Sequence, residues 1–195
     1  MPRPNRSAER RNELLPVLAE AFARIGYRKA TTAELARRCG VQETVLYRLW
    51  DDKKAMFLAS IDHVFERSLA IWEALLAARD SEGTGAERIL AHEATHHGEF
   101  GLYRVLFTGL DEVDDAAVRA HLRDTYRRFH RYLRDRIVEH RASRAIEGGV
   151  DPEAAAWAML GLGTISSIGR EVGMLSSSAR RTLLSNVGRA LLEGP

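Results

Sequence analysis

The fold is decided by residues 31–54, which read TTAELARRCGVQETVLYRLWDDKK. Thr31 is followed three residues later by Glu34, and this capping-box spacing predicts a short helix that ends at Gly40. The apolar spacing after Gly40 predicts a second short helix over about residues 43–50. Two short helices around a glycine turn, in a segment that is otherwise helical, are the sequence form of a helix-turn-helix.

A longer helix precedes this pair. Apolar residues recur at three- and four-residue steps between Leu14 and Ile25. Pro16 lies inside the pattern, where it lacks a backbone donor and crowds the carbonyl of Asn12. We therefore expect this helix either to start near Asn12 or to be kinked before Val17.

The rest of the chain also has helical spacing, and the alternation typical of strands is absent. Loops are expected around Ser81–Gly85, Asp111–Asp115 and Gly148–Gly149, with one or two shorter helices between the first two. The longer helices are expected over about residues 53–78, 114–144, 152–173 and 176–192. The predicted fold is all-α, with a three-helix helix-turn-helix domain in residues 1–52 and a helical bundle in residues 53–195. The helix from about 53 to 78 links them.

Composition and charge fit a soluble protein with a basic end. Residues 1–60 hold 12 Lys and Arg against 7 Asp and Glu, whereas residues 61–195 hold 17 against 20. An arginine-rich arm begins the chain, with Arg3, Arg6, Arg10 and Arg11. Such asymmetry is typical of a domain that binds a polyanion. The chain has no signal-peptide pattern and no membrane-length apolar run, so we expect it in the cytoplasm. Its single cysteine excludes an internal disulfide framework.

The second short helix is the predicted DNA-reading helix. Its expected exposed positions combine amide, carboxylate, hydroxyl, aromatic and guanidinium groups that can reach base edges or phosphates. They are Gln42, Glu43, Thr44, Tyr47 and Arg48. The alternative is an ordinary helical hairpin with a solvated face.

Residues 31–54 resemble the signature of the tetracycline-repressor (TetR) family, and the similarity extends over about residues 10–60. The positions in register are the paired threonines 31 and 32, Leu35-Ala36, Gly40-Val41, Leu46-Tyr47, Trp50 and Lys53. The resemblance implies a homodimeric repressor of double-stranded operator DNA, with a C-terminal body that binds a small-molecule effector. It also implies that Thr31, Thr32, Tyr47 and Lys53 lie at the DNA, with Thr32, Tyr47 and Lys53 near phosphates.

Three positions depart from the family pattern. Glu43 stands where a basic residue is usual, Thr44 where glycine is frequent, and Leu49 where a phosphate-binding histidine is common. Leu49 removes one expected backbone contact, and Glu43 must either avoid phosphate or accept a hydrogen bond from a cytosine amino group. The operator sequence therefore cannot be transferred from a relative.

A competing motif lies at His92-Glu93-Ala94-Thr95-His96, which matches H-E-x-x-H. In metalloproteases this pattern places two zinc-binding histidines one helical turn apart, with the glutamate as base. Such an enzyme also needs a third protein ligand from elsewhere and a cleft that aligns a peptide, usually beside a sheet, and the sequence predicts no sheet here. We expect no catalytic residues, no metal and no other cofactor, and keep a zinc hydrolase and metal sensing through His92 and His96 as alternatives.

Two surfaces of the C-terminal bundle are predicted from residue type. An apolar effector pocket would be lined by aromatic residues, with core packing as the alternative: Phe65, Trp72, Tyr103, Phe107, Tyr126 and Phe129. A two-fold dimer interface would use small and apolar residues of the last two helices, with packing inside one chain as the alternative: Ala158, Gly161, Ile165, Gly169, Leu184, Val187 and Leu191.

The predicted function is a ligand-responsive repressor that binds a pseudo-palindromic operator as a homodimer. A constitutive or activating regulator without an inducer is the alternative within the same class. The sequence leaves open the operator, the effector, the regulated genes and the sign of regulation.

Overall fold

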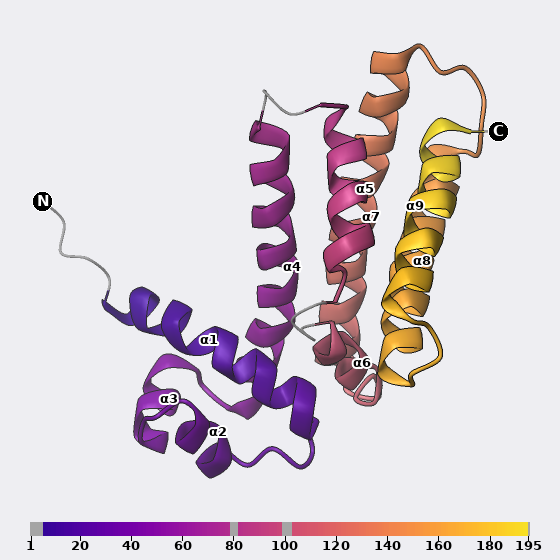
Figure 1. Cartoon of the computed structure of the whole chain (residues 1–195). Helices are drawn as coiled ribbons and strands as arrows, with labels where there is room; N and C mark the ends of the chain where they lie inside the picture. The colour runs from indigo at the N-terminus through magenta and orange to yellow at the C-terminus, as the bar shows by residue number, and fades with distance from the viewer. Residues whose placement is uncertain (1–5, 79–81, 99–102, 195) are drawn as a thin grey trace, which may run out of the picture. The chain divides into compact units, whose positions relative to one another are not determined.

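The computed structural model describes residues 6–78, 82–98 and 103–194, and all of its regular structure there is helical (Figure 1). This confirms the predicted all-α class. The helices are α1 (Arg6–Ile25), α2 (Thr32–Arg38), α3 (Glu43–Leu49), α4 (Lys53–Ala77), α5 (Gly85–His96), α6 (Arg104–Leu110), α7 (Ala116–Arg144), α8 (Pro152–Glu171) and α9 (Ser177–Glu193). No helix of the described residues is long and apolar enough to cross a membrane.

The first helix corrects the expectation for Pro16. The helix does not start near Asn12, because α1 begins at Arg6 and continues through Pro16. Residues 6–13 are exposed, so water can reach the carbonyl that proline leaves without a helical partner. The exposed arginines of this turn include Arg10, which pairs with Glu13, whereas Arg3 lies outside the described residues.

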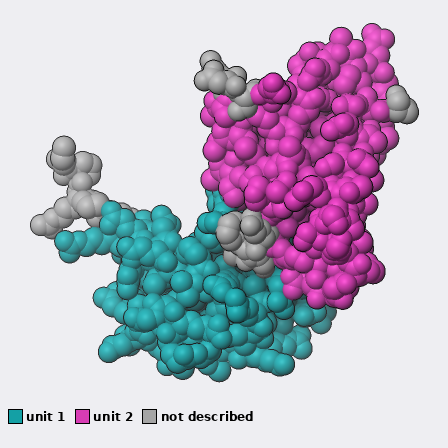
Figure 2. All heavy atoms as spheres, in the orientation of Figure 1, with its two compact units in different colours: residues 1–67, 100–125 teal, residues 68–99, 126–195 magenta. Residues whose placement is uncertain are grey.

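The chain divides into two compact units, coloured separately in Figure 2. Unit 1 comprises residues 1–67 and 100–125, and unit 2 comprises residues 68–99 and 126–195. Contacts therefore group α6 and the start of α7 with the helix-turn-helix. The domain boundary predicted between residues 52 and 53 stays a prediction.

Unit 1 has an aromatic centre. Phe22 and Phe57 meet edge to face with ring centroids 5.1 Å apart, and both side chains are fully buried. α1 packs against α6, where Thr108 Oγ1 lies 3.5 Å from the Phe22 carbonyl oxygen. Two ion pairs tie the turn after α6 to the base of the helix-turn-helix. Arg28 Nε lies 2.8 Å from Glu112 Oε1, and Lys54 Nζ lies 2.9 Å from Asp115 Oδ2.

Unit 2 is held by α9, which packs against both α5 and α8. A Cβ at Gly188 would lie 2.4 Å from a methyl carbon of Leu90, so α5 and α9 approach as closely as glycine allows. The apolar clusters between these helices include Ala94, Leu162 and Leu184.

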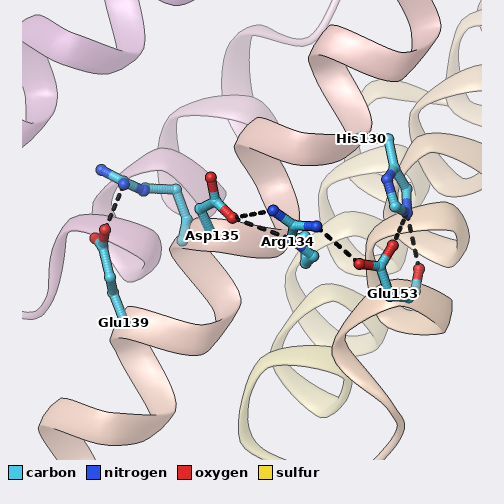
Figure 3. Close-up of polar contacts among 6 residues, drawn as sticks. His130, Arg134, Asp135, Glu139 and Glu153 are labelled. Atoms are coloured by element: carbon cyan, nitrogen blue, oxygen red, sulfur yellow. Dashed lines mark hydrogen bonds and ion pairs between the residues drawn. The ribbon is translucent and has the colours of Figure 1, made fainter.

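The start of α8 is joined to α7 by polar contacts (Figure 3). Arg134 Nη1 donates to Glu153 Oε1 at 2.8 Å, and His130 Nε2 lies 3.0 Å from the Glu153 carbonyl oxygen. The His130 ring also stacks on Trp157, with centroids 4.4 Å apart. These contacts fix the first turn of α8, whose N-cap is Asp151.

Candidate nucleic-acid interface

The helix-turn-helix is built by local capping. Thr31 is the N-cap of α2, and its hydroxyl accepts a hydrogen bond from the Glu34 amide at 3.2 Å. The reciprocal half of the predicted capping box does not form, because the Glu34 carboxylate instead accepts from Arg37 Nε at 2.8 Å and Arg38 Nε at 2.7 Å. Gly40 follows with φ +64°, which glycine adopts without strain, and turns the chain toward α3.

These arginines set the charge state of the carboxyl group. Hydrogen bonds from Arg37 and then Arg38 lower the pKa of Glu34 to about 2. Glu34 therefore stays ionised on the exposed side of α2. Arg37 and Arg38 follow Glu34 by three and four residues, a spacing visible in the sequence, but the sequence was used only to predict Glu34 as the capping-box partner of Thr31.

The buried side of α3 is formed by two leucines. Leu46 and Leu49 are buried, whereas Val45 is only half-buried. The helix ends at Leu49, and Trp50 is its C-cap. Arg11 of α1 lies over the Trp50 ring, 6.0 Å from its centroid.

The opposite side of α3 presents all five predicted DNA-reading positions to solvent: Gln42, Glu43, Thr44, Tyr47 and Arg48. Tyr47 is 50% exposed although it is aromatic. Within the described residues, Arg48 has neither a hydrogen-bond nor an ion-pair partner. Its guanidinium group is thus available to a ligand outside the chain.

Two of the predicted phosphate-binding residues are brought together. Tyr47 Oη lies 3.0 Å from Thr32 Oγ1, so the exposed face of α3 meets the first residue of α2. One hydroxyl donates to the other, and the second proton of the pair remains free for an acceptor outside the chain. A phosphate oxygen is an acceptor of this kind.

The ammonium group of Lys53, which was predicted to lie near a phosphate, is already bound within the chain. It donates to the carbonyl oxygens of Tyr27 at 3.0 Å and Ala30 at 3.1 Å, and it lies 4.4 Å from the Tyr27 ring centroid. Lys53 thus fixes the α1–α2 connection. Contact with a phosphate would have to be shared with these carbonyls or replace them.

The H-E-x-x-H motif has a different structure from a zinc site. Glu93 accepts from Trp72 Nε1 and pairs with His97 Nδ1, both at 2.7 Å, while the His92 and His96 rings stack on each other. The described residues contain no cluster of three or more His, Cys, Asp or Glu side chains able to hold a metal. Burial raises the pKa of Glu93, but the hydrogen bonds from His97 and Trp72 and the nearby charges outweigh it and lower the pKa overall.

The same network superficially resembles a serine, histidine and carboxylate triad. His97 Nε2 lies 3.1 Å from Ser167 Oγ, but it also lies 2.8 Å from the Gly163 carbonyl oxygen. A carbonyl only accepts, so Nε2 carries a proton and cannot act as a base toward the hydroxyl. Ser167 is 4% exposed, which also argues against a nucleophile. The contacts of His97 with Gly163 and Ser167 of α8 could not be predicted from the sequence, because these partners lie 66 and 70 residues away.

The predicted effector residues fall evenly into the two units. Phe65, Tyr103 and Phe107 belong to unit 1, and Trp72, Tyr126 and Phe129 belong to unit 2. Phe65, Trp72 and Phe129 are buried, and the other three are half-buried. Trp72 and Phe129 meet edge to face with ring centroids 5.8 Å apart.

The predicted dimer residues divide by exposure. Ala158, Gly161, Ile165 and Val187 are exposed, and Leu191 is half-buried. Gly169 and Leu184 need correction, because each is buried inside unit 2 and cannot line a surface. Gly169 faces its own chain, where an added Cβ would lie 2.6 Å from a methyl carbon of Leu175.

These geometries define a helix-turn-helix domain of three helices followed by a helical body. Residues 14–60 match the family of bacterial regulatory proteins described as the tetR family. This match confirms, for that segment of the chain, the tetR-family resemblance found in the sequence.

A known protein sequence matches part of this chain. The chain is 42% identical over 57 residues to the nucleoid occlusion factor SlmA of Haemophilus influenzae strain PittGG, a match that covers 29% of this chain and 26% of that protein. The chain therefore matches only about a quarter of this curated relative.

Solved structures match almost the whole chain in fold. A TetR-family transcriptional regulator from Cytophaga hutchinsonii has a TM-score of 0.77 at 16% identity, covering 97% of this chain and 96% of that one. The regulator FadR from Bacillus subtilis, solved in complex with stearoyl-CoA, has a TM-score of 0.69 at 16% identity, covering 94% and 98%.

Proposed function

We propose that this protein is a transcription regulator that binds double-stranded operator DNA through the exposed side of α3. The observation that carries the proposal is the hydroxyl pair of Tyr47 and Thr32, 3.0 Å apart beside the unpaired guanidinium of Arg48. The pair provides a phosphate contact, and Arg48 provides a group that reads guanine in the major groove. The basic balance of residues 1–60 supports the same assignment.

The test begins by selecting bound duplexes from a random DNA pool. Against the selected site, Arg48→Ala should weaken binding by about 1–3 kcal/mol and relax the preference at one position of each half-site. Tyr47→Phe should weaken all duplexes alike, because a phosphate contact carries no base information. Arg123→Ala, which removes an exposed arginine from α7, is the matched control. Unchanged DNA affinity in both helix-turn-helix variants would refute this docking surface.

We propose further that the operator-binding form is a homodimer and that α8 and α9 form its interface. A single helix-turn-helix makes few base contacts, and two copies are needed to read half-sites about one DNA turn apart. One face of α8 exposes a continuous apolar stripe that includes Trp157 at 52%, Ile165 at 41% and Val172 at 67%, and Val187 of α9 is 41% exposed. An exposed patch of this kind is typical of an interface.

Gly161 lies in the middle of the stripe, where an added Cβ would have no neighbour within 4 Å. Two antiparallel copies of α8 crossing at Gly161 would place Trp157 of one copy near Ile165 of the other. Gly161→Arg should therefore give a monomer that keeps its helical circular dichroism and loses operator affinity, because two arginines would meet at the symmetry axis. Arg189→Ala, on an exposed part of α9, should leave the dimer intact. Sedimentation that shows a dimer for Gly161→Arg would refute this interface.

We also propose that a small-molecule effector lowers operator affinity. The buried aromatic contact of Trp72 and Phe129, with the half-buried carboxylate of Glu93 bound to Trp72, supports a site with apolar walls and a few polar groups. FadR, which shares the fold, was solved with stearoyl-CoA, so this thioester is a reasonable first probe. The operator complex would be titrated with stearoyl-CoA and then with fractionated metabolites. A complex that none of them releases would favour the alternative of a regulator without an inducer.

A further inference from the structure

The first turn of α5 is built around a histidine from another helix. Thr84, the N-cap of α5, accepts a hydrogen bond from the Glu87 amide at 3.3 Å, and its own amide donates to the Glu87 carboxylate. The Thr84 hydroxyl also lies 2.8 Å from Nδ1 of His140 in α7. His140 is 3% exposed, and its Nε2 has no hydrogen-bond partner among the described residues. This capping box was not predicted from the sequence.

A hydrogen bond from the Thr84 hydroxyl to Nδ1 of His140 requires a neutral imidazole. The Thr84 oxygen already accepts from the Glu87 amide, so its proton can be donated to the Nδ1 lone pair of His140. Protonation removes that lone pair and leaves the Thr84 hydroxyl proton without its acceptor. It also places a positive charge on a buried ring, which is costly without an anionic partner.

The charged groups around His140 do not supply such a partner. The charges of Glu87 in α5 and Glu193 in α9 raise the pKa of His140. Those of Arg141 and Arg144 in α7 lower it. The Glu87 carboxylate is also already bound, by the Thr84 amide and by Arg144 Nη2 at 2.9 Å. Burial is the largest influence, and the pKa of His140 lies below its ordinary value of 6.5.

The other end of α5 is anchored differently. His97, the C-cap of this helix, contacts the Gly163 carbonyl oxygen and Ser167 Oγ of α8. The His140 contact therefore acts on the end of α5 that holds Thr84, and not on the end that His97 anchors.

We propose that His140 is an acid-sensitive lock on the first turn of α5. The neutral ring stabilises the hydrogen-bonded first turn of α5 through Thr84. Protonation of the ring disrupts this turn, so that water can reach the imidazolium. Because the folded-state pKa lies below 6.5, the stabilisation is fully present above about pH 6.5 and is lost as the pH falls through the lower, folded-state value. α5 packs against α9, so a loosened α5 weakens the support of the helix that carries part of the proposed dimer face.

The test is amide hydrogen exchange of the full chain at about pH 7.5 and about pH 5, corrected for the chemical exchange rate at each pH. Amides near the start of α5, above all those of Glu87 and Arg88, should exchange several-fold faster in acid in the wild type. His140→Asn keeps an oxygen acceptor near the position of Nδ1 but cannot take up a proton. It should abolish this acceleration.

A second histidine of α7 provides the matched control. His121 lies 3.2 Å from Asp62, and its pKa is raised by this hydrogen bond, so His121→Asn should leave the acid response of α5 unchanged. The imidazole titration of His140 in the wild type, followed by NMR, should have its midpoint below 6.5. A midpoint at or above that value would overturn the proposal even if His140→Asn fails to fold. So would an acid response of α5 that persists in the folded variant.

Discussion

Arg141 offers the sharpest test of how unit 2 is held together. This side chain is 8% exposed, and its guanidinium donates to three carbonyl oxygens at 3.0 Å or less, those of Leu192, Leu191 and Val150. Two of these carbonyls are in the last turn of α9, where helical partners are lacking and the dipole favours a cation. One buried arginine thus joins α7 to the end of α9 and to the loop before α8.

Arg141→Met keeps most of the apolar stem and removes every donor. Each carbonyl left without a partner destabilises the folded state by about 1–3 kcal/mol, whereas removal of the buried charge stabilises it by several kcal/mol. We therefore expect a net loss of about 2–4 kcal/mol in the free energy of unfolding. With a urea dependence of about 2 kcal/mol per molar, the transition that involves unit 2 should move down by about 1–2 M.

The assay is urea unfolding followed by circular dichroism at neutral pH. Arg131→Met, which changes an exposed arginine of the same helix, is the control and should shift the midpoint little. Equal shifts for Arg141→Met and Arg131→Met would show that the carbonyl contacts do not stabilise the fold, and the reasoning would fail.

The remaining predictions concern titration, the lysine at the start of α4, and metal content. Glu34 should titrate near pH 2 by carboxyl NMR, so its contribution to stability is present above pH 4.5 and is lost as the pH falls through 2. Arg37→Gln should raise the midpoint of this titration, and an unchanged midpoint would contradict the assigned cause. Lys53→Ala should lower the stability of the free protein by about 1–2 kcal/mol, because the Tyr27 and Ala30 carbonyls lose their donor. Lys29→Ala, at an exposed lysine, should not lower it, and equal stability of the two variants would leave phosphate binding as the main role of Lys53. Protein purified without a histidine tag should contain no stoichiometric zinc, since the Glu93 carboxylate is held by its own chain, and near-equimolar zinc would revive the metal hypothesis.

The sequence alone predicted most of the helices and the exposed side of α3. Capping residues and turn glycines act within a few positions of the chain, so Thr31, Gly40 and Asp151 mark helix boundaries that the structure reproduces. The exposed positions of α3 follow in the same way from a helical period of 3.6 residues. Of the two expectations for Pro16, a helix start near Asn12 is wrong, because an exposed helical turn tolerates the missing bond.

Tertiary structure decided which partners these residues meet. The H-E-x-x-H spacing could not reveal that Glu93 binds Trp72, because Trp72 lies 21 residues away in the sequence. The same holds for Lys53 on the α1–α2 carbonyls and for Gly169, whose small size serves Leu175 of its own chain. Local periodicity specifies which side of a helix is apolar, but only the packing of distant helices specifies what that side touches.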